Sequence, residues 1–215
     1  MKQELYYCKH IDCQICKDRT ERTDRGFKHI ESKKGEKYVF EILDTYTMVF
    51  ILSGEALISC NEFTDIHFHA GQIVLWPMSS NCVWETIEDT ACIVLAGDTE
   101  LAPCDRKALK EHADLWLDTD PDFKALEIKP RLMDFLATIK NYLDDGITCP
   151  YMHKTKQQEL SVIFRAYYPQ QELMDFFLPT LCNTHEFEHF IMNNYLKMKG
   201  VKEFVDSSGM KYKYF

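Results

Sequence analysis

Short apolar runs and turn-forming residues alternate through the first hundred residues of the chain. The runs are rich in Val, Ile, Phe, Thr and Trp, and pairs such as Ser53-Gly54 and Glu88-Asp89 separate them. Many short strands at even spacing predict a β-sandwich or a small barrel, with a tight hairpin at Gly54. The polar segment 12–36 is expected to be irregular. The expected strands are residues 36–43, 46–53, 55–61, 65–69, 72–76, 82–87 and 90–97.

After Gly97 the apolar residues recur three and four positions apart, which is the period of an amphipathic helix. Pro130 suits the first turn of one such helix, and Gly146 suits its end. The chain is therefore predicted to be α+β, with a β part followed by a helical part. The expected helices are residues 105–117, 129–144, 154–168, 171–177 and 184–198.

The expected helix over residues 129–144 carries an apolar stripe along one side. The spacing of four, three and four residues suits the pairing of two helices, so we expect a homodimer. The same stripe suits packing on the chain's own sheet equally well, and the sequence leaves both arrangements open. The stripe consists of Leu132, Leu136, Ile139 and Leu143.

Composition and charge narrow the class of protein. The 215 residues are 46% hydrophobic and 27% charged, which is ordinary for a globular protein. The longest apolar run, residues 48–52, is only strand-sized, and the first residues contain no apolar segment of a secretory signal. We therefore expect a cytoplasmic protein. The net charge of −9 excludes a wholly basic nucleic-acid coat.

Nine cysteines are a high number for this length. In the cytosol they are expected to be free thiols rather than disulfides. Three of them lie near the start, and two of these have the Cys-x-x-Cys spacing of half a zinc site. No second half follows, so metal binding by these three cysteines is left open. Those three are Cys8, Cys13 and Cys16. The cysteines expected in the core are Cys60, Cys82, Cys92 and Cys182.

A glycine, five strand residues and a proline form a local signature at residues 71–77. The glycine makes a sharp turn into the strand and the proline ends it. This signature resembles the second conserved element of the cupin family, a small β-barrel. Metal-binding cupins place a histidine five residues after that proline, where this chain has Cys82. His67 and His69 have a suitable spacing but lack the following acid, so no metal, cofactor or catalytic residue is expected.

The C-terminal end has the pattern of a helix, a tight turn and a second helix. Val201, Phe204 and Val205 would form the packed face of a short helix, and Gly209 would allow the turn. Residues 191–215 resemble the first helix-turn-helix of the AraC/XylS family of transcription regulators. Members of that family commonly carry a cupin-like sensor and a helical linker that dimerises.

This resemblance implies three parts in chain order. Residues 1–102 would form a cupin-like sensor with an N-terminal arm, residues 103–182 a helical linker for dimerisation, and residues 183–215 an incomplete helix-turn-helix domain. The chain ends inside the expected recognition helix, so DNA binding is expected only of an extended form. The residues expected to contact DNA are Lys202, Lys211, Tyr212 and Lys213.

The expected function is the ligand-sensing and dimerisation portion of an AraC-type regulator, and not an enzyme. A barrel without metal can still hold a small molecule in its mouth, and the effector here is unknown. Large aromatic residues could line that mouth or serve as plain core. The pocket candidates are Phe50, Trp76 and Trp84. Two alternatives stay open, a cupin-type metal-dependent enzyme and an effector-free interaction module.

Overall fold

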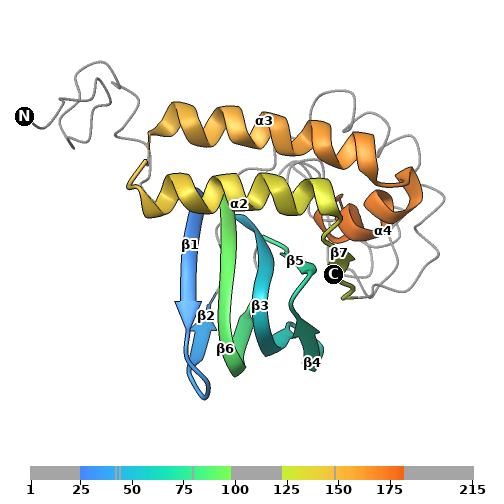
Figure 1. The fold of residues 1–215 in the computed structure, drawn as a ribbon. Coiled ribbons are helices and arrows are strands. Elements are labelled where there is room, and N and C mark those ends of the chain that lie inside the picture. Colours follow the sequence, from blue (N-terminus) through green and yellow to red (C-terminus); the bar gives the residue numbers. More distant parts are fainter. Residues whose placement is uncertain are drawn as a thin grey trace, which may run out of the picture.

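The computed structural model of the chain describes residues 25–97 and 123–181, apart from residues 42, 44, 79 and 148. These residues form an antiparallel sheet, and the helices pack against side chains of one of its faces (Figure 1). No helix in the described ranges is long and apolar enough to cross a membrane. The expected helices 105–117 and 184–198, the N-terminal cysteines and the expected helix-turn-helix with its four DNA-contacting residues lie outside the described residues.

Two long strands form the centre of the sheet, and shorter strands flank them. β3 and β6 pair along nearly their whole length, β1 and β2 share the free edge of β6, and β4 and β5 share the free edge of β3. The path β1-β6-β3-β5-β7 is open, so the predicted barrel is not closed within the described residues. The strands are β1 (Gly26–Ser32), β2 (Lys37–Phe40), β3 (Tyr46–Cys60), β4 (Phe63–His69), β5 (Gln72–Trp76), β6 (Cys82–Gly97) and β7 (Leu126–Glu127).

The hairpin predicted at Gly54 is wrong, because β3 continues through this residue. The pairing of β3 with β6 shifts register between Ile51 and Ala56, which is the mark of a bulge rather than a turn. Gly54 has a φ of +82°, and a Cβ atom there would overlap the carbonyl oxygen of Asp89 on β6. Glycine therefore serves the close approach of the two central strands at this bulge.

The segment predicted to be irregular contains a strand instead. Residues 26–32 form β1, which pairs with β6 from Ser32↔Thr90 to Gly26↔Ala96. Most of its side chains after Phe27 are exposed or half-buried, because the strand lies at the edge of the sheet. A solvated edge strand is polar in sequence and for that reason resembles a loop.

The predicted helices of the described region are confirmed, with shifts at their ends. They are α2 (Pro130–Asp144), α3 (Pro150–Tyr167) and α4 (Gln170–Leu181). Both α2 and α3 begin with a proline in the first turn, where a missing N–H costs nothing. The prediction started α3 four residues late because it did not use Pro150 as a start signal.

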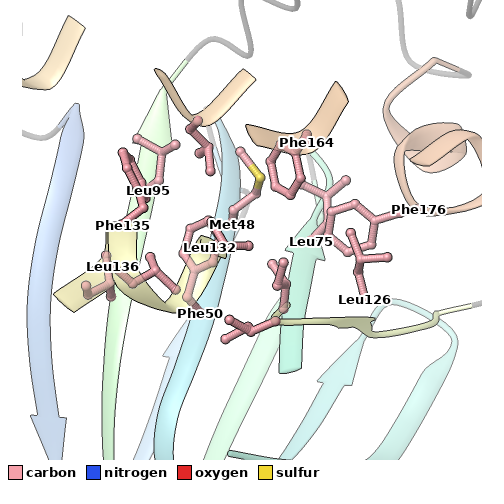
Figure 2. Close-up of a cluster of buried hydrophobic side chains, with 14 of the residues drawn as sticks. Met48, Phe50, Leu75, Leu95, Leu126, Leu132, Phe135, Leu136, Phe164 and Phe176 are labelled. Carbon is pink, nitrogen blue, oxygen red and sulfur yellow. The ribbon is translucent and has the colours of Figure 1, made fainter. Parts of the chain in front are cut away.

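Side chains of the sheet alternate between two buried clusters, one on each face. We call the first the helix-side cluster, because the side chains of α2, α3 and α4 complete it (Figure 2). Its sheet residues include Phe27, Met48, Phe50, Ile73, Leu75, Ile93 and Leu95. We call the second the inner cluster. It consists of Val49, Ile51, Ala56, Ile58, Cys60, Phe68, Val74, Trp76, Cys82, Trp84, Cys92 and Phe123.

The apolar stripe of α2 belongs to the helix-side cluster. Leu132, Leu136 and Ile139 are each 0% exposed, and Leu143 is partly buried against the same cluster. Figure 2 shows Leu132 and Leu136 lying beside Phe50 of β3. The stripe therefore packs on the chain's own sheet, the second of the two arrangements that the sequence left open, and its buried side chains are covered without a second chain.

Candidate ligand site on the inner face of the sheet

The inner cluster is built from alternate residues of the central strands and from aromatic side chains of the strands beside them. Trp76 ends β5 and Trp84 lies near the start of β6, and their rings meet edge to face with centroids 6.3 Å apart. Phe40 of β2 lies against Trp76 at 5.1 Å between ring centroids. Three strands thus bring three large aromatic rings together on one face.

Of the three pocket candidates, the structure brings two together and separates the third. Trp76 and Trp84 are 4% and 5% exposed and share the inner cluster. Phe50 is fully buried in the helix-side cluster, on the opposite face. The period of two along β3 explains the difference, because Val49 and Ile51 on either side of Phe50 point into the inner cluster. Phe50 is therefore part of the core under the helices.

The two indole N–H groups of this face have different surroundings. Trp84 Nε1 donates to Thr86 Oγ1 at 3.0 Å, and that hydroxyl also lies 2.9 Å from Ser32 Oγ. Trp76 Nε1 is buried and has no hydrogen-bond partner among the described residues. A buried donor without an acceptor is rare in native proteins and calls for a physical reason. The Trp76 N–H is thus the one indole donor of this face without a partner among the described residues.

A pair of thiols lies at the end of the same cluster. Cys60 and Cys82 are directly opposite each other on β3 and β6, with their Sγ atoms 3.2 Å apart. Ser80 Oγ lies 3.4 Å from Cys82 Sγ and donates to the Pro77 carbonyl. Cys60, Cys82 and Cys92 are all buried, as the sequence predicted, while Cys182 lies outside the described residues. Sequence reasoning did not find the pair, because it depends on the register of two strands.

The three buried thiols differ in their acidity. Hydrogen bonding from the Cys60 thiol lowers the pKa of Cys82, although burial opposes this. The same partnership raises the pKa of Cys60, because its proton is held by Cys82 and its loss would place two thiolates together. Burial alone raises the pKa of Cys92 to about 12. Cys82 is therefore the thiol of this cluster that ionises first.

The residues present do not fit the metal site of metal-binding cupins. His67 and His69 are exposed on the outer side of β4, while Phe68 between them points into the inner cluster. Cys82, which stands at the position of the cupin histidine, points to the other face and has Cys60 as its neighbour. Among the described residues, no three His, Cys, Asp or Glu side chains lie together in an arrangement that could hold a metal ion.

The described part of the chain is thus an α+β unit with an open antiparallel sheet. No model of a protein family matches the chain, and no curated protein matches it. One similar solved structure is an RmlC-like cupin family protein with a double-stranded β-helix fold from Methanocaldococcus jannaschii. It has 20% identity and a TM-score of 0.30, and the match covers 33% of this chain and 67% of that one.

Two further similar structures show the same partial coverage. A cupin 2 conserved barrel domain protein from Leptotrichia buccalis has 14% identity and a TM-score of 0.31 over 33% of each chain. A predicted oxalate decarboxylase from Thermotoga maritima has 15% identity and a TM-score of 0.30, over 33% of this chain and 63% of that one. These matches therefore cover a third of this chain and between 33% and 67% of those proteins.

Proposed function

We propose that this chain is the ligand-sensing and dimerising portion of a transcription regulator of the AraC type. The proposal is supported by the order of its parts, a sheet with an aromatic inner face, helices packed on the opposite face, and the helix-turn-helix pattern of residues 191–215. A small molecule would bind at the inner face, two chains would pair, and an extended form would read DNA.

The unpartnered N–H of Trp76 is the observation that carries the sensing role. A buried donor left without an acceptor costs about 1–3 kcal/mol, so a ligand that supplies an acceptor is favoured by a comparable amount. The rings of Phe40 and Trp84 pack on Trp76, one tilted and one edge to face, and would give a ligand at Trp76 apolar neighbours. The chemistry of this face suits a flat, largely apolar molecule with one carbonyl or carboxylate oxygen directed at Trp76.

Binding without turnover is the role that the side chains of this face favour. The polar groups beside the aromatic rings are hydroxyls and thiols, and the Trp84–Thr86–Ser32 chain is already satisfied internally. The other buried side chains of the inner cluster are apolar. General acid-base catalysis needs a positioned ionisable group within hydrogen-bond reach of the substrate, whereas binding needs an apolar surface and a few polar contacts. We therefore propose a sensor rather than an enzyme.

A native mass spectrum of the purified chain tests the sensing role. We expect a bound small molecule that is released on denaturation. The variant Trp76→Phe should bind this molecule roughly 5- to 150-fold more weakly, which corresponds to one lost hydrogen bond of about 1–3 kcal/mol. The matched control is Trp84→Phe, because its ring is equally buried but its N–H is already bonded to Thr86. Equal retention by the two variants would contradict the role of the Trp76 N–H.

The regulatory role and the homodimer have separate tests. Sequence-specific gel shifts should appear for a form extended through two helix-turn-helix units and should be absent for residues 1–215, because these resemble the family in only the first of the two units. Light scattering should give twice the mass of one chain. An extended form that shifts no genomic fragment would contradict the regulator, and a monomer at all concentrations would contradict the pairing.

A further inference from the structure

Cys60 and Cys82 form a buried thiol pair that belongs to two different strands. Cys60 is the last residue of β3 and Cys82 is the first residue of β6, and the two are directly opposite in the antiparallel register. They are 2% and 0% exposed, and their Sγ atoms are 3.2 Å apart. Both side chains therefore point to the inner face and toward each other.

The backbone at this pair already has a separation that a disulfide can span. Directly opposite residues of antiparallel strands have Cα atoms about 4.5–5.5 Å apart, and disulfides join Cα atoms about 4.4–6.8 Å apart. The sulfur atoms need to approach by roughly 1.2 Å to reach a bond length of about 2.05 Å. Side-chain rotation and small shifts at the strand ends are enough for that approach.

The surroundings of Cys82 favour its ionised form, which is the reactive form of a thiol. The Cys60 thiol and the Ser80 hydroxyl both lie within hydrogen-bonding distance of Cys82 Sγ. The hydrogen bond with Cys60 lowers the pKa of Cys82, against the opposing effect of burial. Cys92 has no second thiol beside it in the described residues, and its burial raises its pKa to about 12. The pair and the single thiol of the same cluster are thus a matched comparison.

We propose that Cys60 and Cys82 are a reversible redox site that closes to a disulfide in the presence of a hydroperoxide. This goes beyond the proposed sensing of a small molecule at the aromatic rings. The Cys82 thiolate attacks one oxygen of the peroxide, the O–O bond breaks, and hydroxide leaves and takes a proton to become water. The Cys60 sulfur then attacks the sulfenic acid of Cys82, the S–S bond forms, and the S–O bond breaks with release of a second water. Two electrons pass from the sulfurs to the peroxide.

The position of the pair in the sheet gives a small oxidant a route to it. Both residues stand at strand ends, at the end of the sheet away from α2 and α3 (Figure 1). Hydrogen bonds at the ends of strands open at a lower free energy than those in their middle. Hydrogen peroxide, which is only slightly larger than water, can therefore reach Cys82 through local opening without unfolding of the whole domain.

The test is peptide mapping of the folded chain after treatment with hydrogen peroxide. Remaining thiols are blocked with N-ethylmaleimide during unfolding, and cleavage follows at glutamate, because cleavage at Lys and Arg leaves Cys60, Cys82 and Cys92 in one peptide. Glutamate cleavage places Cys60 in residues 56–62, Cys82 in residues 63–85 and Cys92 in residues 89–100. We expect the first two peptides joined, with the mass of two hydrogen atoms lost, and separated again by dithiothreitol.

The variants Cys60→Ser and Cys82→Ser should each abolish the joined peptide, and Cys92→Ser should leave it unchanged. Circular dichroism before oxidation checks that each variant is folded. If a variant does not fold, peptide mapping of the unaltered chain alone decides the test. Recovery of both peptides blocked by N-ethylmaleimide after peroxide would overturn the proposal. A joined peptide that forms only after denaturation, or that links Cys82 mainly to another cysteine, would also overturn it. If Trp76→Phe loses ligand binding but still forms the disulfide, the redox site is independent of the proposed sensing role.

Discussion

Trp76 and Trp84 meet edge to face with ring centroids 6.3 Å apart, yet only the Trp84 N–H has a hydrogen-bond partner among the described residues. The two residues are almost equally buried, so substitution to Phe removes a similar apolar area from each. Without ligand, Trp84→Phe should therefore cost about 1 kcal/mol more than Trp76→Phe, because it also loses the bond to Thr86. Urea unfolding of both variants measures this difference, and an equal loss would contradict the assignment.

The α2 stripe is expected to govern folding rather than pairing. Leu136 is fully buried against the sheet, so Leu136→Ala should lower the free energy of unfolding by about 2–5 kcal/mol. Leu136→Glu combined with Ile139→Glu should abolish the fold, because two carboxylates would be buried without partners. The control is Asn141→Ala, an exposed position of the same helix, with a change within about 0.5 kcal/mol. A folded protein with both glutamates would contradict the packing.

Substitution of Gly54, at the bulge in β3, can be compared with substitution of Gly71, which lies outside the bulge. Their φ values are +82° and +88°, so alanine is strained at both by about 1–2 kcal/mol. At Gly54 the added Cβ would also lie 2.6 Å from Thr90 Oγ1, whereas nothing lies within 4 Å at Gly71. Thermal unfolding should therefore show a clearly larger loss for Gly54→Ala. Similar losses would mean that β3 and β6 do not approach closely at the bulge.

His153 of α3 should make the stability depend on pH. It lies half-buried beside β1, and its Nδ1 accepts a hydrogen bond from the Phe27 N–H at 3.1 Å. Burial lowers the pKa of His153 in the folded chain below its ordinary 6.5. The unfolded chain therefore takes up a proton first as the pH falls, so this contribution is present above pH 6.5 and is lost as the pH falls below it.

Unfolding midpoints measured between pH 7.5 and pH 5 test this effect, because that interval spans the ordinary histidine pKa of about 6.5. The control is His153→Gln, whose side-chain oxygen can accept the same bond but does not titrate. The decline toward acid should be weaker in the variant than in the unaltered chain. Parallel curves would show that His153 does not contribute.

The sequence by itself determined most of the local structure in the described region. The three-and-four spacing of Leu132, Leu136 and Ile139 and the proline before them were sufficient for α2, because an amphipathic helix carries its period in its own residues. β5 followed in the same way from a glycine, five strand residues and a proline. The period of two along a strand likewise places exposed His67 and His69 on the side opposite to buried Phe68.

Only the tertiary structure decided which of these surfaces meet. Whether the α2 stripe contacts a second chain or its own sheet depends on residues far away in the sequence, and so does the face on which Phe50 lies relative to Trp76. The bulge at Gly54 looks like a turn in sequence, because glycine serves both a reversal of the chain and a close approach of two strands. The approach of Cys60 to Cys82 and the unpartnered N–H of Trp76 arise from the register of strands distant in sequence, and a one-residue slip would place those side chains on the other face.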